Sequence, residues 1–217
     1  MELLEEYASR AFPEDAKEGE GKDEGAGSSP NYRTEPRHVV RRRGTAQSHV
    51  LMGCPAFDLF DKRRLGLSLL ANILGGNGMN ARLNMELREK RGLVYHVECS
   101  YTPYTDSGLF SIYFGSSHRA EAEAVELVYR ELERLAKEPL TEAELTAALR
   151  QTRGQLLVAS DNKEQHFLTM GKSFLHTGRF DTDEELSERL ATLTPEGLYE
   201  TARELFQRVN FHTLIYR

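Results

Sequence analysis

Arg88 and Tyr95 stand seven residues apart in a segment that also carries a glycine-rich turn. A guanidinium and a phenol both carry hydrogen-bond donors, so this pair could contact a substrate. Each residue also has a structural explanation. Arg88 lies near the expected end of a helix, where cations are favoured, and Tyr95 lies in an expected strand as a half-buried aromatic. The residue types alone leave both interpretations open.

The glycine-rich turn consists of Gly75, Gly76, Asn77 and Gly78. Its backbone N–H groups could bind an anion at the start of the following helix. However, the turn follows a helix rather than a strand, and it fits neither G-x-G-x-x-G nor G-x-x-x-x-G-K-[ST]. We therefore favour a helix end closed by glycine in the left-handed conformation. A G-x-S-x-G nucleophile motif is also absent from the sequence.

The histidines and cysteines do not form a metal-binding pattern. No two of the seven histidines are three to five residues apart, and the zinc peptidase motif H-x-x-E-H does not occur. Cys54 and Cys99 are the two cysteines, without C-x-x-C spacing, and are expected to be buried free thiols. The sequence therefore predicts no metal ligands and no cofactor in this chain.

The composition is that of a globular domain. Of the 217 residues, 39% are hydrophobic and 29% are charged. The net charge of −6 argues against a nucleic-acid partner, and the basic run at residues 41–43 is expected on an exposed strand edge. Apolar runs are far shorter than the ~20 residues of a membrane span. We expect a soluble protein, cytoplasmic or periplasmic, because a secretory signal could lie upstream of Met1.

The chain divides into three segments by composition. Residues 1–12 show helical spacing of apolar residues and are interpreted as a helix from the end of a preceding domain. Residues 13–36 are rich in Glu, Gly, Lys, Ser and Pro and are interpreted as a flexible linker, because such a segment buries too little apolar surface to fold. Residues 37–217 form the expected folded domain.

Within this domain, strand pairs alternate with blocks of helices. Strands are predicted at 38–47, 48–55, 94–101, 108–116 and 210–216. Helices are predicted at 59–74, 79–90, 119–137, 141–158, 163–176, 182–193 and from 194 onward. The first two strands are expected to meet near Thr45, and capping boxes are expected at Thr141 and Thr182. The order indicates an α+β fold, a mostly antiparallel sheet with helices packed on one face.

Alternation in the strand at 94–101 predicts two faces. The first face is expected to carry Tyr95, Val97, Cys99 and Tyr101. The second face is expected to carry His96, Glu98 and Ser100.

Residues 73–97, ILGGNGMNARLNMELREKRGLVYHV, resemble the signature of the C-terminal domain of pitrilysin-like zinc metallopeptidases. This family includes insulin-degrading enzyme, mitochondrial processing peptidase and two-subunit bacterial processing proteases. Three further segments are similar to the family pattern: residues 47–50 to its second strand, 101–115 to its hairpin, and 139–145 to a loop that enters a helix. The resemblance covers roughly residues 37–217.

The resemblance implies a domain that holds no zinc and closes against a zinc-bearing catalytic domain, of the same or another polypeptide, around a peptide substrate. Carried over by position, Arg88 and Tyr95 match the family's arginine–tyrosine pair, which contacts substrate and transition state at that zinc site. Because the catalytic half is missing from this sequence, we expect the chain to be inactive alone and a dimer in the full-length protein.

Two other interpretations stay open. Some family members keep the fold, lose the chemistry and act as scaffold or assembly subunits, although the presence of Arg88 and Tyr95 favours the catalytic role. An anion- or nucleotide-binding module would instead bind its ligand at residues 75–78.

Overall fold

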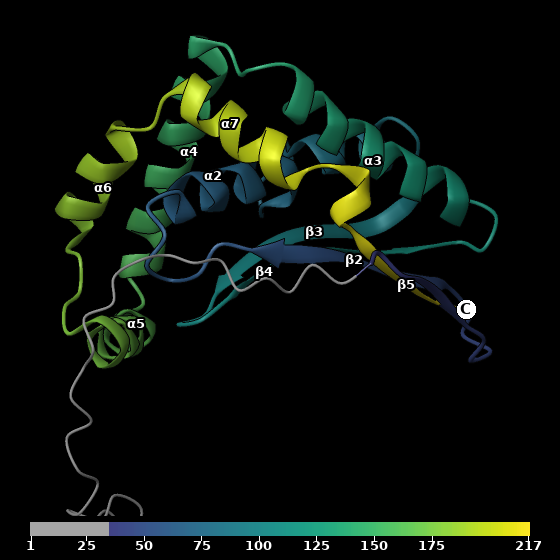
Figure 1. Cartoon of the computed structure of the whole chain (residues 1–217), viewed down its shortest axis with the longest axis horizontal. Helices are drawn as coiled ribbons and strands as arrows, with labels where there is room; N and C mark the ends of the chain where they lie inside the picture. The colour runs from purple at the N-terminus through teal and green to yellow at the C-terminus, as the bar shows by residue number, and fades with distance from the viewer. Residues whose placement is uncertain (1–34) are drawn as a thin grey trace, which may run out of the picture.

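The computed structural model describes residues 35–217, so the helix predicted at 1–12 and nearly all of the predicted linker lie outside the described residues (Figure 1). Five strands form one sheet: β1 (His38–Arg41), β2 (Ser48–Ala56), β3 (Val94–Pro103), β4 (Gly108–Ser116) and β5 (His212–Tyr216). Their order across the sheet is β1-β5-β2-β4-β3. The β1–β5 pair is parallel and the other pairs are antiparallel.

The position of β5 corrects one expectation. The strands predicted at 38–47 and 48–55 do not meet near Thr45, because the C-terminal strand lies between them. β1 ends at Arg41, and β5 pairs with β1 on one side and with β2 on the other. Beyond β1, the Arg43 N–H donates to the Arg217 carbonyl oxygen at 2.6 Å, and Gly44 turns the chain with φ +65°. The pairing thus joins residues from opposite ends of the domain.

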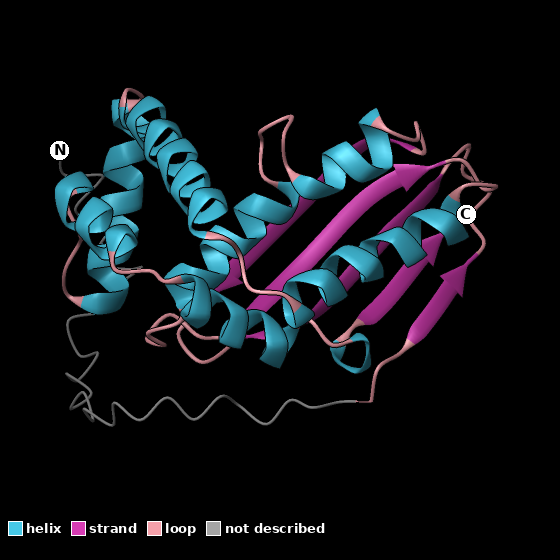
Figure 2. Ribbon diagram, turned by 90° about the horizontal axis from the view of Figure 1, so that it is seen from above, coloured by secondary structure: helices cyan, strands magenta, loops and turns pink. Residues whose placement is uncertain are grey.

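The described helices are α2 (Arg64–Gly75), η1 (Asn84–Glu89), α3 (Glu121–Lys137), α4 (Glu142–Ser160), α5 (Lys163–Thr177), α6 (Asp183–Ala191), α7 (Pro195–Leu205) and η2 (Arg208–Asn210). α2, α3 and α7 cover one face of the sheet, whereas α4, α5 and α6 gather at one end (Figures 1 and 2). Within residues 35–217 no helix lies on the other face of the sheet, its uncovered face, and this arrangement confirms the predicted one-sided α+β fold.

The core lies between the sheet and the three covering helices. Alternate residues of β2 and β4 point into it, and the most deeply buried ones are Val50, Met52, Phe110, Ile112 and Phe114, each with no exposed surface. The opposite residues of both strands stay partly or fully exposed. This period-two pattern is the physical basis of the sheet prediction.

Most helix ends lie close to the positions that their capping residues predicted. Thr141 with Glu144, and Thr182 with Glu185, form the predicted capping boxes. The helix predicted from residue 59 begins only at Arg64, because the Asp58 carboxylate accepts the backbone N–H groups of Phe60 and Asp61 and holds a turn there. Among the described residues, no helix combines the length and the apolar character needed to cross a bilayer.

Candidate functional site

Arg88 lies in a π-helical segment. In η1 the Lys90 N–H donates to the Met85 carbonyl oxygen at 3.0 Å, a bond that spans five residues instead of four. Such widened turns are frequent at functional sites. Leu87 is fully buried, which anchors the segment, while the Arg88 side chain is 50% exposed. Within residues 35–217 its one charged contact is the Glu89 carboxylate, 3.6 Å from Nε, so the outer guanidinium nitrogens are available to a ligand.

A glycine closes the end of this segment. Gly92 adopts φ +62°, and its N–H donates to the Arg88 carbonyl oxygen at 2.9 Å. The next N–H, that of Leu93, donates to the Leu87 carbonyl oxygen at 2.8 Å. The left-handed helix end that we predicted for residues 75–78 therefore occurs here, between Arg88 and β3.

Tyr95 occupies a β-bulge. Val94 pairs with Ser116 and His96 pairs with Gly115, so Tyr95 has no partner on β4. A bulge shifts the alternation of a strand by one residue and redirects a side chain. Accordingly, Tyr95 is 80% exposed, although Val94 and Val97 on either side are 3% and 2% exposed.

The prediction that Tyr95 shares a face with Val97 is therefore wrong, because the bulge turns its ring outward. Val97, Cys99 and Tyr101 do share the inner face, and His96, Glu98 and Ser100 share the other face as predicted, where all three are exposed. The structure thus places Arg88 and Tyr95 on the surface of two consecutive elements, η1 and β3, that pack against each other. Neither residue has a role in the core.

A row of polar side chains crosses the uncovered face of the sheet beside Tyr95. His96 and His49 both lie opposite Gly115, one on each side of β4. His49 Nδ1 is 2.8 Å from the Tyr113 hydroxyl, and Tyr113 lies opposite Glu98. His49 and Tyr113 were not among the predicted site residues, although polar residues at alternate strand positions were the signal for them.

Gly115 leaves room in the middle of this row. A Cβ atom placed there would meet only Gln47 Oε1, at 3.4 Å. Glycine in a strand often marks a place where another backbone or a ligand approaches closely. The row therefore offers hydrogen-bonding groups on both sides of an open strip of backbone.

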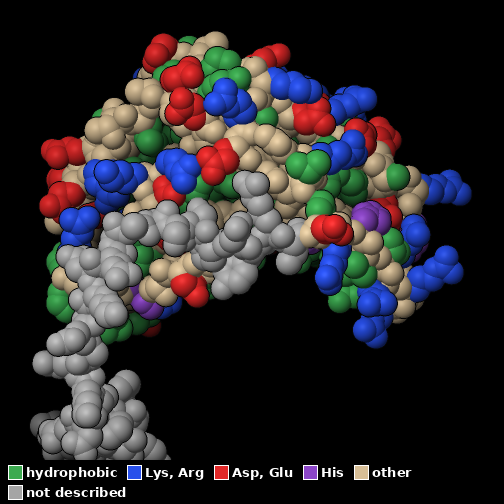
Figure 3. Space-filling model, in the orientation of Figure 1, with side chains coloured by type: hydrophobic (Ala, Val, Ile, Leu, Met, Phe, Trp, Pro, Cys, Tyr) green, Lys and Arg blue, Asp and Glu red, His purple; other side chains and the backbone are tan. Residues whose placement is uncertain are grey.

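An apolar hollow of about 800 Å³ continues the same face toward the other end of β4. Leu51 and Leu109, each 44% exposed, and Leu214 of β5 line it. Side chains of this kind could receive apolar groups of an extended ligand. Arg41, which also lines this hollow, and the following Arg42 and Arg43 are exposed as predicted, and Lys and Arg side chains gather near the C-terminus (Figure 3).

The glycine-rich turn has a packing role that differs from the predicted one. Gly76 is extended, with φ −68° and ψ 176°, rather than left-handed. A Cβ atom on Gly75 would lie 2.7 Å from Cys99 Cβ, and one on Gly76 would lie 1.9 Å from Asn72 Oδ1. The glycines are required because α2 approaches β3 and its own last turn too closely for side chains.

The surroundings of the turn do not favour a phosphate. A hollow of about 270 Å³ beside it is lined by Asn72, Asn80, Arg82 and Gln151. Asn80 Nδ2 donates to Gln151 Oε1 at 2.7 Å, and Arg82 pairs with Glu144 at 3.0 Å. The one lining cation is thus already neutralised, so the hollow has the character of a polar contact between α2 and α4.

Comparison with known proteins agrees with this geometry. Residues 2–152 match the family model described as the peptidase M16 inactive domain. The chain belongs to the M16 peptidase family. The resemblance to pitrilysin-like zinc metallopeptidases is thereby confirmed.

Relatives of this M16 chain are named zinc proteases. An uncharacterized zinc protease of Streptomyces coelicolor is 32% identical over 166 residues, which are 76% of this chain and 36% of that protein. The uncharacterized zinc protease YmxG of Bacillus subtilis is 30% identical over 189 residues, which are 87% of this chain and 45% of that protein. The chain therefore spans less than half the length of these relatives.

Solved structures share the M16 fold. The peptidase M16 inactive domain from Pseudomonas fluorescens superposes with a TM-score of 0.73 at 24% identity, covering 84% of this chain and 44% of that chain. A protease from Helicobacter pylori gives a TM-score of 0.75 at 20% identity, again covering 84% of this chain and 44% of the other. At these identities the likeness concerns the fold alone.

Zinc is the metal that the M16 family implies, and the residues described here do not fit it. Within residues 35–217, no group of three or more His, Cys, Asp or Glu side chains could hold a metal ion. Burial raises the pKa of Cys54 to about 12, and burial with the nearby Cys54 raises that of Cys99 well above its usual range. Since a thiol binds metal as a thiolate, neither cysteine is a suitable ligand at neutral pH.

Proposed function

We propose that this chain is the non-metal-binding domain of an M16 zinc metalloendopeptidase. It forms part of the chamber wall and supplies Arg88 and Tyr95 to a peptide held at a zinc site on another domain or subunit. The observation that carries the proposal is the outward position of both side chains. Tyr95 in particular is 80% exposed where ordinary strand alternation would bury it.

The two side chains can act on a peptide in different ways. The Arg88 guanidinium presents planar N–H groups that suit carbonyl oxygens of a bound chain. The Tyr95 hydroxyl can donate a hydrogen bond to the oxyanion that develops on the scissile carbonyl group. The backbones at Arg88 and Tyr95 are held in place, because the adjacent residues Leu87 and Val94 are buried in the core. Fixed donors of this kind lower a reaction barrier most effectively.

The partner in this proposal is a zinc-bearing domain. Residues 37–217 form the domain that contacts this partner. The lengths of the zinc-protease relatives support it, since each contains more than twice the matched region. The zinc-bearing domain belongs to the same or another polypeptide, and the full-length protein is a dimer.

The substrate class is an extended peptide. The polar row at His49, Tyr113 and His96 can bind backbone groups, and the apolar hollow near Leu51 can receive side chains. Both lie on the uncovered face of the sheet, next to the strand that carries Tyr95. This arrangement supports a chamber wall rather than a narrow small-molecule pocket.

The test uses the complete protein with its zinc-bearing part. Arg88→Ala and Tyr95→Phe are each expected to reduce peptide turnover by ~10²–10³, as removal of one oxyanion donor commonly does. Arg119→Ala and Tyr199→Phe remove the same groups elsewhere and should leave turnover unchanged. Full activity of both site variants would contradict the proposal and favour a scaffold role.

A further inference from the structure

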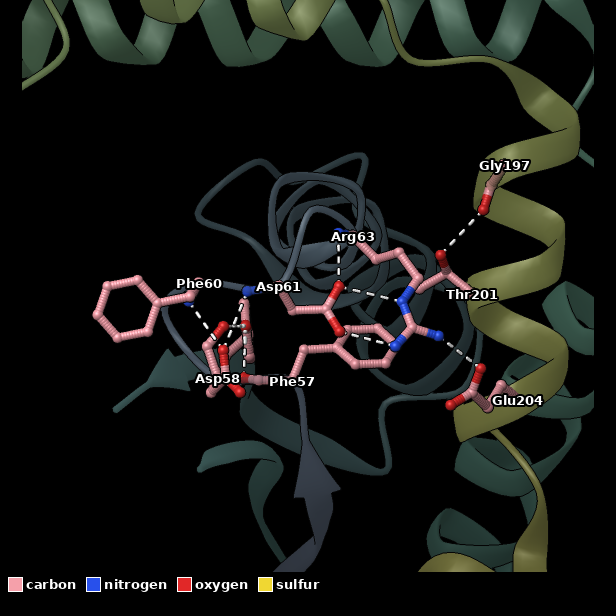
Figure 4. A network of polar contacts seen from close by, with 9 residues as sticks. Phe57, Asp58, Phe60, Asp61, Arg63, Gly197, Thr201 and Glu204 are labelled. Atoms are coloured by element: carbon pink, nitrogen blue, oxygen red, sulfur yellow. Dashed lines mark hydrogen bonds and ion pairs between the residues drawn. The ribbon is translucent and has the colours of Figure 1, made fainter. Parts of the chain in front are cut away.

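Two consecutive arginines at the start of α2 have opposite surroundings. Arg63 donates two hydrogen bonds to Asp61 and one to Glu204, and its guanidinium lies 3.9 Å from the Phe57 ring centroid (Figure 4). Arg64 is half-buried, and its backbone N–H donates to the Asp61 carbonyl oxygen at 3.2 Å, yet within residues 35–217 its guanidinium makes no hydrogen bond and no ion pair. The difference indicates that Arg64 is placed for a group that the domain itself does not provide.

Arg64 lines a pocket of about 310 Å³ between α2, α4, α5 and α6. Ser160, Thr169 and Ser173 also line it, with their hydroxyl groups bonded to backbone carbonyl oxygens, and Leu156, Met170 and Phe180 give it apolar walls. A second arginine, Arg189, reaches the same pocket. The volume suits one or two amino-acid residues of a ligand rather than a nucleotide.

Within residues 35–217, the carboxylates that line the pocket form no ion pair with Arg64. Asp181 forms its ion pair with Arg189. Asp183 is the first residue of α6, where a carboxylate is already stabilised by the positive end of that helix. Arg64 itself is the first residue of α2, whose first turn contains no acidic residue, so the dipole of its own helix opposes its charge.

The local electrostatics show the same imbalance. Burial is the largest cause that lowers the pKa of Arg64, and repulsion from Arg189 lowers it further, while attraction by Asp181 and Tyr101 offsets part of this. Because a guanidinium stays protonated in proteins, the site holds a half-buried cation with no ion-pair partner among residues 35–217. A bound anion would relieve both the loss of hydration and the repulsion.

We propose that this pocket binds a carboxylate attached to an apolar residue, as at the C-terminus of a peptide, with Arg64 as the principal charged partner. A guanidinium pairs with a carboxylate through two parallel hydrogen bonds, and the apolar walls can receive the neighbouring side chain. Tyr101, which interacts electrostatically with Arg64, lies six positions beyond Tyr95 on β3, about 20 Å along an extended strand. The pocket is therefore distinct from the proposed Arg88–Tyr95 site and does not depend on it.

Calorimetric titration of the 217-residue chain with matched peptides tests the proposal. The probes are acetyl-Gly-Gly-Leu with a free carboxylate, the same peptide as its amide, and acetyl-Gly-Glu-Leu amide. We expect the free acid to bind at least tenfold more tightly than the neutral amide. Tighter binding of the Glu peptide than of the free acid would assign the site to an acidic side chain of a partner protein. Equal affinity of all three would overturn the proposal.

Variants of the chain complete the experiment. Arg64→Gln should weaken binding of the free acid at least tenfold, whereas Lys62→Gln, which removes a neighbouring exposed charge, should not. Because Arg64 loses no partner, Arg64→Gln should keep or raise the melting temperature. Undiminished binding by Arg64→Gln would overturn the proposal, and so would a clear drop in its melting temperature. Neither result would affect the separate proposal that Arg88 and Tyr95 contribute to peptide turnover.

Discussion

Arg63 and Asp61 are joined by two parallel hydrogen bonds, from Nε to Oδ1 at 3.0 Å and from Nη2 to Oδ2 at 2.7 Å. Nη1 extends the contact to Glu204 on α7 at 2.7 Å. The guanidinium thus connects the loop after β2, the start of α2 and a helix from the far end of the chain. This connection fixes the position of α2, and with it the neighbouring Arg64.

The first prediction concerns the stability of this connection in acid. Burial raises the pKa of Asp61, but the hydrogen bonds and charge of Arg63 together outweigh it, so the net pKa is lowered. A lowered carboxyl pKa contributes stability above the unfolded value of about 3.9 and loses it as the pH falls through the folded value. Asp61→Asn should therefore be less stable than the wild type at pH 7, by about 0.5–1 kcal/mol because Arg63 is partly exposed.

Urea unfolding at a series of pH values measures this effect. The difference between Asp61→Asn and the wild type should shrink below about pH 4, where the wild-type carboxylate becomes protonated. Asp106→Asn, in the exposed turn between β3 and β4, is the matched control and should show little difference at any pH. A pH-independent difference for Asp61→Asn would show that its charge is not the source of the stability.

The second prediction compares two glycines in helices. A Cβ atom on Gly75 would lie 2.7 Å from Cys99 Cβ and 2.8 Å from its backbone nitrogen, whereas one on Gly154 in α4 would meet nothing within 4 Å. Gly75→Ala should therefore destabilise the domain by about 1–3 kcal/mol through overpacking. Gly154→Ala should stabilise it by up to about 1 kcal/mol, because alanine favours the helix. Urea unfolding of both variants should give opposite signs, and equal signs would refute the packing argument.

Interactions between sequence neighbours were the ones that could be predicted. The capping boxes at Thr141 and Thr182 and the alternation of β4 depend on residues only a few positions apart, and the structure contains them. The place of β5 between β1 and β2 depends on residues from the two ends of the domain. No local pattern specifies that pairing, so the sequence analysis joined β1 to its nearest neighbour.

The geometry of single residues at the candidate site could not be predicted from the sequence either. Arg88 and Tyr95 were selected through a family resemblance, but their geometry was not foreseen. The bulge at Tyr95 follows from the register between Val94 and Ser116, which only the paired strands define. The isolation of Arg64 likewise arises from helices that are distant in sequence. Contacts of this kind are set by tertiary packing and leave no periodic signal.

The third prediction concerns the two thiols. With a pKa raised to about 12 by burial, Cys54 has only roughly one thiolate in 10⁴ molecules at pH 8. The pKa of Cys99 is raised as well. Neither cysteine should react with a disulfide reagent in the folded chain within minutes, and both should react in urea. Ser68→Cys, on the exposed side of α2, should add one thiol that reacts immediately. Rapid labelling of Cys54 in native buffer would contradict its burial.

The last prediction separates function from folding at the proposed site. Tyr95 is 80% exposed and the Arg88 side chain is 50% exposed, so folding does not remove much surface of either side chain from water. Tyr95→Phe and Arg88→Ala should each change the free energy of unfolding of the 217-residue chain by less than about 0.5 kcal/mol, as is usual for surface substitutions.

Val97→Ala, two positions beyond Tyr95 on β3, provides the contrast. Val97 is 2% exposed and belongs to the core cluster. Its truncation should cost roughly 2 kcal/mol, because two methyl groups leave an apolar environment and a cavity remains. Urea unfolding of the three variants measures all of these values. If Arg88→Ala or Tyr95→Phe destabilised the chain as much as Val97→Ala, their loss of turnover in the complete protein would reflect unfolding. If they do not, a 10²–10³ loss reports on contacts made to the reacting peptide.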